Sequence, residues 1–380
     1  MKIQMVDLQS QYQTLKKEID AAISNVIETA GFINGPEVDQ FAREFAAYNQ
    51  APHAVTCANG TDALQLAFMA LELKPGDEVI VPSFTYVATA EAIALLGLTP
   101  VFADVDPDLF MLTAASIEKK ITPKTKAIVP VHLFGQCAEM ENILLLAQAH
   151  NLYVIEDTAQ AVGAVYTFSD GTSKKAGTMG HIGTFSFFPS KNLGCYGDGG
   201  ALLTNDTRLA ERLQILANHG QRTRYYHELI GINSRLDGIQ AAILRVKLPH
   251  LNSFCASRNK SASFYDAAFC NLDGICIPKR SERSSHVFHQ YTLKCTGINR
   301  DNLRAHLQKK GIPTMVYYPL PIHQQKAYTH FVQDSTGYPV SEQLSSQVLS
   351  LPIHSEQTED HLSYIASVIR EYLHQEVVLV

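Results

Sequence analysis

The sequence has no run of apolar residues long enough for a membrane-spanning helix, which needs about 20 of them. It also has no basic tract, since 31 Lys and Arg stand against 37 Asp and Glu and give a formal net charge of −6. The first residues, MKIQMVDLQSQY, lack the apolar core of a signal peptide. These absences argue against a membrane protein and a nucleic-acid-binding protein, and they favour a cytoplasmic one.

Disulfide and metal-binding patterns are missing as well. The seven cysteines stand at positions 57, 137, 195, 255, 270, 276 and 295 without a CxxC pair, and the 15 histidines form no HExxH motif. An odd, scattered set of cysteines is typical of reduced thiols in a cytosolic enzyme. We therefore expect neither a disulfide framework nor a metal site.

The composition that remains is that of a well-packed globular protein, with 46% hydrophobic and 18% charged residues. The first 240 residues alternate short apolar β-rich runs, such as DEVIVPS (77–83), with helical segments. This rhythm predicts an α/β fold with a mostly parallel central sheet flanked by helices. A long helical stretch (237–269), broken near Pro249, follows. Because 380 residues exceed one ordinary core, we expect a large domain (1–248) and a smaller C-terminal α/β domain (249–380).

The segment FSFFPSKNLGCYGDGGALLT (185–204) places one lysine, Lys191, between aromatic residues and a glycine-rich loop. A lysine near apolar walls loses part of the solvation that keeps it protonated, and it becomes a candidate amine nucleophile. The alternative is a lysine at the edge of the core with its charged end in solvent.

In parallel sheets, ligands bind beyond the carboxyl ends of the strands. Asn59-Gly60-Thr61-Asp62 follows a predicted strand (54–58) and begins a predicted helix. Free amides at a helix start, a glycine and a hydroxyl are suited to phosphate. An ordinary helix N-cap is the alternative.

A second strand (152–157) ends in two acids, Glu156 and Asp157, and Gln160 follows. One of the carboxylates could pair with a cationic ring nitrogen, and Gln160 could donate to an oxygen on that ring. A solvated strand end or a helix cap is the alternative.

An aromatic residue and a serine complete the set. Tyr86 begins a predicted helix (86–96), where a flat ring could stack on it, and core packing is the alternative. Ser186 stands five residues before Lys191 and could bind a phosphate, or bond only to the backbone. Phosphate cradle, stacking ring, carboxylate and amine are together what pyridoxal 5'-phosphate requires.

These segments resemble the DegT/DnrJ/EryC1/StrS family of nucleotide-sugar aminotransferases, a branch of the fold-type I enzymes that use pyridoxal phosphate. The likeness runs nearly end to end, and its most specific blocks are IEDTAQA (155–161), FSFFPSKNLG (185–194) and GINSRLDGIQAAIL (231–244). A nicotinamide-binding enzyme would instead need a GxGxxG fingerprint, which CANGTD (57–62) does not provide.

The resemblance implies a role for each matching residue. Lys191 is similar to the Schiff-base lysine that also moves the proton during catalysis. The cofactor contacts that the resemblance implies are Gly60, Thr61 and Ser186 at the phosphate, Tyr86 stacked on the ring, Asp157 at the ring nitrogen, Gln160 at the ring oxygen, and Asn233 reaching from a neighbouring subunit. Substrate contacts are implied for Arg235, Tyr318 and His323. The implied assembly is a homodimer with shared active sites.

The resemblance also implies a reaction in two halves. Glutamate leaves its amino group on the cofactor as pyridoxamine 5'-phosphate, and a nucleotide-linked keto-sugar then accepts it. The sequence segments PSKNLGCYGDGGA (189–201) and GINSRLD (231–237) are most similar to those of relatives that aminate C3 of a UDP-2-acetamido-3-keto-hexuronic acid for polysaccharide precursors. The alternative substrates are a dTDP-3-keto-6-deoxyhexose and a 4-keto sugar. The alternative class of protein is a non-catalytic regulatory relative that binds the cofactor. Tyr317 stands where many relatives have histidine before the tyrosine, so the resemblance does not define the substrate contacts of this loop.

Overall fold

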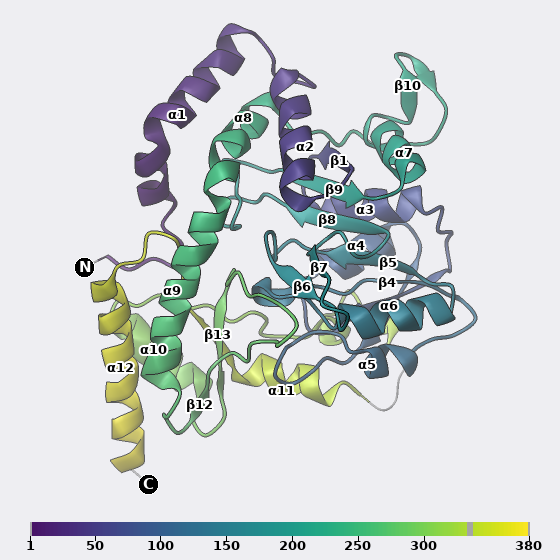
Figure 1. Ribbon diagram of the computed structural model, residues 1–380. Coiled ribbons are helices and arrows are strands. Elements are labelled where there is room, and N and C mark those ends of the chain that lie inside the picture. Colours follow the sequence, from purple (N-terminus) through teal and green to yellow (C-terminus); the bar gives the residue numbers. More distant parts are fainter. Residues whose placement is uncertain (1, 333–336, 379–380) are drawn as a thin grey trace.

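The computed structural model describes residues 2–332 and 337–378, and its centre is a seven-stranded sheet (Figure 1). In spatial order the strands are β1 (His53–Cys57), β9 (Gly200–Thr204), β8 (Ile182–Ser186), β5 (Tyr153–Asp157), β4 (Thr125–Ile128), β2 (Glu78–Pro82) and β3 (Thr99–Ala103). The pairs from β8 to β3 are parallel, and β9 runs antiparallel to both of its neighbours. The predicted mostly parallel sheet is confirmed.

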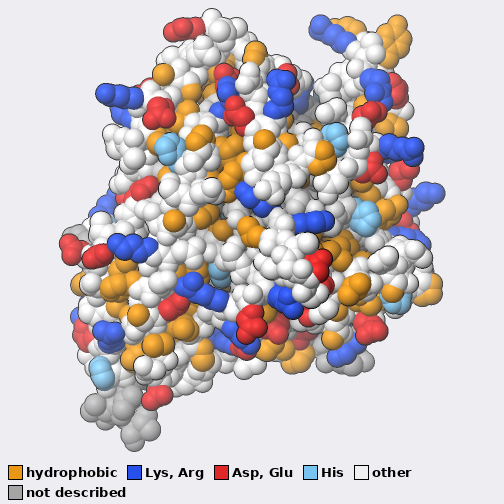
Figure 2. Space-filling view, viewed as in Figure 1, with side chains coloured by type: hydrophobic (Ala, Val, Ile, Leu, Met, Phe, Trp, Pro, Cys, Tyr) orange, Lys and Arg blue, Asp and Glu red, His pale blue; other side chains and the backbone are white. Residues whose placement is uncertain are grey.

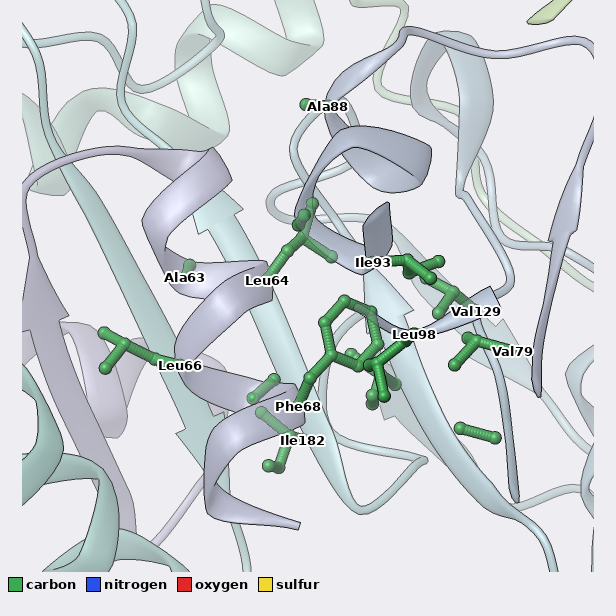
Figure 3. Packing of buried hydrophobic residues seen from close by; sticks show 14 of the residues in the cluster. Ala63, Leu64, Leu66, Phe68, Val79, Ala88, Ile93, Leu98, Val129 and Ile182 are labelled. Carbon is green, nitrogen blue, oxygen red and sulfur yellow. The ribbon is translucent and has the colours of Figure 1, made fainter. Parts of the chain in front are cut away.

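Both faces of the sheet are covered, because side chains along a strand point alternately to opposite faces. On β2, Val79 and Val81 join one apolar cluster while Ile80 joins another. The first cluster is formed with α3 (Gly60–Ala70), α4 (Ala88–Leu95) and α7 (Thr207–Ala217). Figure 3 shows Phe68 of α3 lying among side chains of the sheet and of α4. Such burial on two sides explains the continuous apolar run at 79–82 of β2.

The opposite face is covered by helices from distant parts of the chain. These are α2 (Pro36–Asn49), α5 (Ala114–Glu118), α6 (Met140–Ala149) and α8 (Gly238–Lys247). The N-terminal helix α1 (Leu8–Glu28) packs along α8. Two hairpins extend from the body: β6 (Val165–Thr167) with β7 (Ser173–Lys175), and β10 (Gln221–Thr223) with β11 (Tyr226–His227), the latter projecting beyond α7 in Figure 1.

A second sheet lies in the C-terminal part. It is antiparallel and consists of β12 (Ile275–Cys276), β13 (Tyr291–Cys295) and β14 (Val348–Leu351). Its core is shared with α9 (Leu251–Phe269), α10 (Arg300–Lys309) and α12 (Glu359–Val378), and α11 (Pro339–Gln347) precedes β14. The predicted break near Pro249 is confirmed, since a 3-10 turn (Leu248–His250) separates α8 from α9. The proposed domain boundary falls in this turn and stays a prediction.

The surface agrees with the modest net charge. In the view of Figure 2, acidic and basic side chains are interspersed over one face of the molecule. None of the helices in residues 2–332 and 337–378 is long and apolar enough to cross a membrane.

Candidate active site

A cavity of about 980 Å³ lies at the carboxyl edge of the parallel strands, where open α/β sheets bind ligands. Strands β5 and β8 end there, and α3 begins there. Eight of the residues that the sequence singled out line this cavity: Gly60, Thr61, Tyr86, Asp157, Gln160, Ser186, Lys191 and Tyr318. The volume is in the range of small-molecule sites, which bury most of a bound ligand.

Lys191 lies in the loop that follows β8. The loop is tight: the Lys191 amide donates to the Phe188 carbonyl at 2.8 Å, and a Cβ on Gly194 would stand 2.3 Å from the Pro189 carbonyl oxygen. Burial of the amine lowers the pKa of Lys191 to about 8, and the nearby Asp157 carboxylate opposes this shift. About a tenth of the amine is therefore neutral and nucleophilic at pH 7, a far larger share than in a solvated lysine.

Asp157 ends β5 and is the acid that faces the cavity. Its Oδ2 accepts a hydrogen bond from Thr89 Oγ1 at 2.8 Å, and its Oδ1 accepts from the Ala159 amide at 3.2 Å. The carboxylate is almost fully buried, at 6% exposure. A carboxylate held in this way is suited to pair with a protonated ring nitrogen of a ligand in the cavity.

Glu156, the neighbouring acid, is fully buried and bonds to other parts of the protein instead of facing the cavity. It lies beside His132, whose Nε2 is 2.9 Å from Oε2, and it accepts hydrogen bonds from the backbone amides of Gly177, Met179 and Gly180. Adjacent strand residues point to opposite faces, so only one of the two acids can face the cavity. The structure identifies that acid as Asp157.

The start of α3 forms the end of the cavity next to Ser186. Asn59 Oδ1 accepts from the Asp62 amide at 2.8 Å, so Asn59 caps the helix, and this cap uses only one of the amides that a helix start leaves unpaired. A Cβ on Gly60 would lie 2.8 Å from the Cβ of Ser186, closer than real side chains approach. The glycine therefore leaves room beside Ser186 at a helix N-terminus, where an anion is favoured.

Two aromatic residues, Tyr86 and Tyr318, also line the cavity. Tyr86 is 57% exposed into this open space, and its ring centre lies 6.1 Å from that of Tyr318. The Tyr318 hydroxyl accepts from Gln160 Nε2 at 3.1 Å, and Gln160 Oε1 accepts from the Phe134 amide at 2.9 Å. Burial raises the pKa of Tyr318, which keeps its hydroxyl protonated. The predicted helix from Tyr86 begins two residues later, at Ala88, so Tyr86 is on the loop.

Three expected site residues do not line this cavity. Asn233 is exposed, and Arg235 lines a separate cavity of about 340 Å³. His323 is buried, with Nδ1 2.6 Å from Ser83 Oγ and Nε2 3.1 Å from Glu342 Oε1. A 3-10 turn (Ile322–Gln324) places its ring against these partners, and the expectation that His323 faces the substrate stays a prediction.

Sequence reasoning missed two side chains at this site. Thr89 sits in the apolar helix α4, where a single threonine gives no sign of a bond to Asp157. His289 lines the cavity from a segment almost a hundred residues beyond Lys191, and no spacing in the sequence indicates it.

The residues present fit pyridoxal phosphate. The cavity offers an amine of lowered pKa in Lys191, a buried carboxylate in Asp157, and a glycine-lined helix start beside Ser186. The cofactor needs an amine for its aldehyde, an acid for its ring nitrogen and an anion site for its phosphate.

Comparison with curated proteins gives long matches. The chain is 46% identical over 372 residues to a UDP-N-acetyl-3-dehydro-α-D-glucosamine 3-aminotransferase of Acidithiobacillus ferrooxidans, covering 98% of both chains. It is 44% identical to a UDP-2-acetamido-2-deoxy-3-oxo-D-glucuronate aminotransferase of Pseudomonas aeruginosa, covering 93% of this chain and 95% of the relative. It is 42% identical to a dTDP-3-amino-3,4,6-trideoxy-α-D-glucose transaminase of Streptomyces venezuelae, covering 98% and 96%.

Solved structures of aminotransferases have the same fold as this chain, and one of them contains the cofactor. DesV of S. venezuelae superimposes with a TM-score of 0.93 at 42% identity, covering 98% of each chain. NtdA of Bacillus subtilis with bound pyridoxamine phosphate superimposes with a TM-score of 0.88 at 30% identity, covering 95% of this chain and 82% of NtdA. The model of the DegT/DnrJ/EryC1/StrS aminotransferase family matches residues 13–370. The chain thus belongs to the DegT/DnrJ/EryC1/StrS aminotransferase family and is a fold-type I sugar aminotransferase that depends on pyridoxal phosphate.

Proposed function

We propose that this enzyme transfers an amino group from glutamate to C3 of a UDP-2-acetamido-3-keto-hexuronic acid, in the synthesis of precursors for cell-surface polysaccharide. The observation that carries the proposal is the meeting of the Lys191 amine and the buried Asp157 carboxylate in one cavity of about 980 Å³. The two UDP-sugar relatives, at 44% and 46% identity, support the choice of nucleotide and carbon. We place the reaction in the cytoplasm.

We propose that Lys191 binds the cofactor and, when released from it, moves the proton between substrate and cofactor. Its lowered pKa favours the free amine that this role requires. Asp157, oriented by Thr89, would keep the ring nitrogen of the bound cofactor protonated. When bound, pyridoxal phosphate supplies an electron sink that stabilises negative charge on the reacting carbon.

The other cavity residues bind and orient. We assign the phosphate to the start of α3, with Gly60, Thr61 and Ser186 around it. Tyr86 would stack on the ring, and Gln160, which Tyr318 and Phe134 hold in place, would contact the ring oxygen. Tyr318 then also faces the substrate.

We further propose a homodimer in which Asn233 reaches the cofactor phosphate of the neighbouring subunit and Arg235 faces its substrate. The exposure of Asn233, away from the cavity of its own chain, supports this proposal. Residues that complete a site across a two-fold axis do so at both sites of the dimer.

The test is a panel of keto-sugars offered with glutamate. We expect a 3-amino product from the UDP-3-keto-hexuronic acid, with a kcat/KM at least about tenfold above that for dTDP-3-keto-6-deoxyhexoses. The dTDP-sugar relative makes the latter the second candidate. Preference for a dTDP or a 4-keto sugar would overturn the substrate proposal, and a protein that binds the cofactor but aminates nothing would indicate a regulatory role.

A further inference from the structure

Lys247 is a buried lysine to which the proposed function gives no role. It is the last residue of α8, its side chain is 1% exposed, and burial lowers its pKa to about 8. Within residues 2–332 and 337–378, its amine forms no ion pair with a carboxylate. Burying an amine without an acid costs free energy that an apolar side chain of similar size does not cost. The contacts of this amine therefore indicate what the lysine contributes.

The Lys247 amine contacts the loop that carries Lys191. Its Nζ donates to the carbonyl of Gly194, three residues after Lys191, at 2.7 Å. It also lies 4.3 Å from the centre of the Tyr196 ring, whose face attracts a cation. One side chain of α8 thus binds the backbone of the Lys191 loop and packs on a ring of the same loop.

Gln240 holds this loop from the same face of α8. It stands seven residues before Lys247, which is two helical turns, so the two side chains point in nearly the same direction. Gln240 Oε1 accepts from the Tyr196 amide at 2.7 Å, and its Nε2 donates to the Tyr196 carbonyl at 3.4 Å. A Cβ on Gly197 would stand 2.9 Å from that Nε2, so the loop and the helix are in close contact.

The rest of the loop is fixed as well. The Cys195 amide donates to the Phe187 carbonyl at 2.8 Å, which closes the loop back on the end of β8. The Leu193 side chain packs with Leu244 of α8 in one buried apolar cluster. The backbone of Lys191 is therefore held between β8 on one side and α8 on the other, and its amine has a defined position in the cavity.

We propose that Lys247 is a positioning residue for Lys191: the hydrogen bond from its amine to the Gly194 carbonyl keeps the loop closed on α8, and so keeps the Lys191 amine where it reaches the cofactor. Lys247 moves no proton itself, since it does not line the cavity. Displacing a reacting group by about 1 Å can lower a rate roughly a hundredfold. The inference rests on the proposed function, in which Lys191 binds the cofactor and moves the proton.

The first test measures the two half-reactions separately. Lys247→Met keeps the length of the side chain without a donor, and Lys247→Gln keeps a donor without the charge. Arg245→Met is the matched control, since Arg245 is a cation of the same helix that bonds Glu37 and Glu44 instead of the loop.

Because both half-reactions use Lys191, we expect Lys247→Met to lower kcat in both by about tenfold or more, with little change in either KM. Lys247→Gln should recover part of this rate, and Arg245→Met should keep the wild-type rates. A wild-type kcat in Lys247→Met would overturn the inference. A loss confined to one half-reaction, or to its KM, would also overturn it, because such a loss indicates a substrate contact.

The second test follows Lys191 in the enzyme freed of cofactor, by NMR titration of isotope-labelled lysine. The Lys191 signal is identified by its absence from Lys191→Ala. A loosened loop lets water reach the amine, so the pKa of Lys191 should rise from about 8 toward 10.5 in Lys247→Met and stay near 8 in Arg245→Met. A mere loss of stability would leave this pKa where it is, and an unchanged value in Lys247→Met would refute the positioning role.

Two further variants separate the possible outcomes. If Lys247→Gln shifts the pKa of Lys191 as far as Lys247→Met does, the charge acts and the hydrogen bond does not, which also overturns the inference. Should Lys247→Met not fold, Gln240→Met loosens the same loop at Tyr196 and is titrated in its place. A wild type that binds the cofactor through another lysine refutes the proposed function, while the titration of Lys191 still decides the inference.

Discussion

At the residue scale, the chemistry of Lys191 is set by two opposing neighbours. Burial lowers its pKa from 10.5 to about 8, and the Asp157 carboxylate limits the shift. A lysine with a depressed pKa is an ammonium ion below that value and a free amine above it, so its reactivity rises with pH through about 8. We expect the rate at which the cofactor-free enzyme binds the cofactor to rise with pH, with a midpoint near pH 8. Visible absorbance of the bound cofactor measures this rate. A midpoint near 10.5, that of a solvated lysine, would contradict this.

Replacing Asp157 tests how its carboxylate affects the pKa of Lys191. Asp157→Asn removes the negative charge that favours the ammonium form, so the pKa of Lys191 should fall further below about 8. The same titration of cofactor binding against pH measures the shift. A midpoint that moves upward would mean that the two groups are not coupled as described.

Thr89 offers a test of how Asp157 is held. Thr89→Val keeps the shape of the side chain but leaves Asp157 Oδ2 without its 2.8 Å donor. An unsatisfied buried acceptor costs about 1–3 kcal/mol, and we expect the free energy of unfolding to fall by this amount. Urea unfolding of the cofactor-free enzyme measures it. Thr89→Ser, which keeps the hydroxyl, is the control, and equal stability of both variants would contradict the account.

At the element scale, the beginning of α3 leaves no room for a side chain at Gly60. Gly60→Ala would place a Cβ 2.8 Å from the Cβ of Ser186, so either the helix start or the serine must move out of the proposed phosphate site. We expect cofactor affinity to fall about tenfold or more, measured by equilibrium dialysis. Gly31→Ala is the control, because its Cβ meets other atoms only at 3.5 Å and beyond. Equal affinity of the two variants would refute this site.

Elements also explain what the sequence could and could not predict. Strands such as β2 are buried on both faces, and their continuous apolar runs predict a covered parallel sheet. The period of two along β5 predicts that Glu156 and Asp157 diverge, but tertiary contacts decide which faces the cavity. The contacts of His323 with Ser83 and Glu342 are not indicated by the sequence, because His323 lies in a short 3-10 turn and turns carry little periodic signal. His289 joins the site only through long-range packing.

At the scale of the whole molecule, the proposed homodimer makes a quantitative prediction. Lys191→Ala and Asn233→Ala should each be nearly inactive alone, because each removes part of every site. After unfolding and refolding together in equal amounts, half of the dimers combine one chain of each kind, and one of their two sites is intact. About a quarter of wild-type activity should therefore return. Recovery of none would mean that both residues serve the site of their own chain.

The measurement that most directly tests the central claim is chemical capture of the cofactor on the enzyme as purified. The account predicts visible absorbance, loss of that band on borohydride reduction, and a phosphopyridoxyl group on the peptide that contains Lys191. Lys247, a second buried lysine whose pKa burial lowers to about 8, should carry no label, because its amine is bonded to the Gly194 carbonyl. A label on any lysine other than Lys191, or a Lys191→Ala enzyme that still transaminates, would contradict the account.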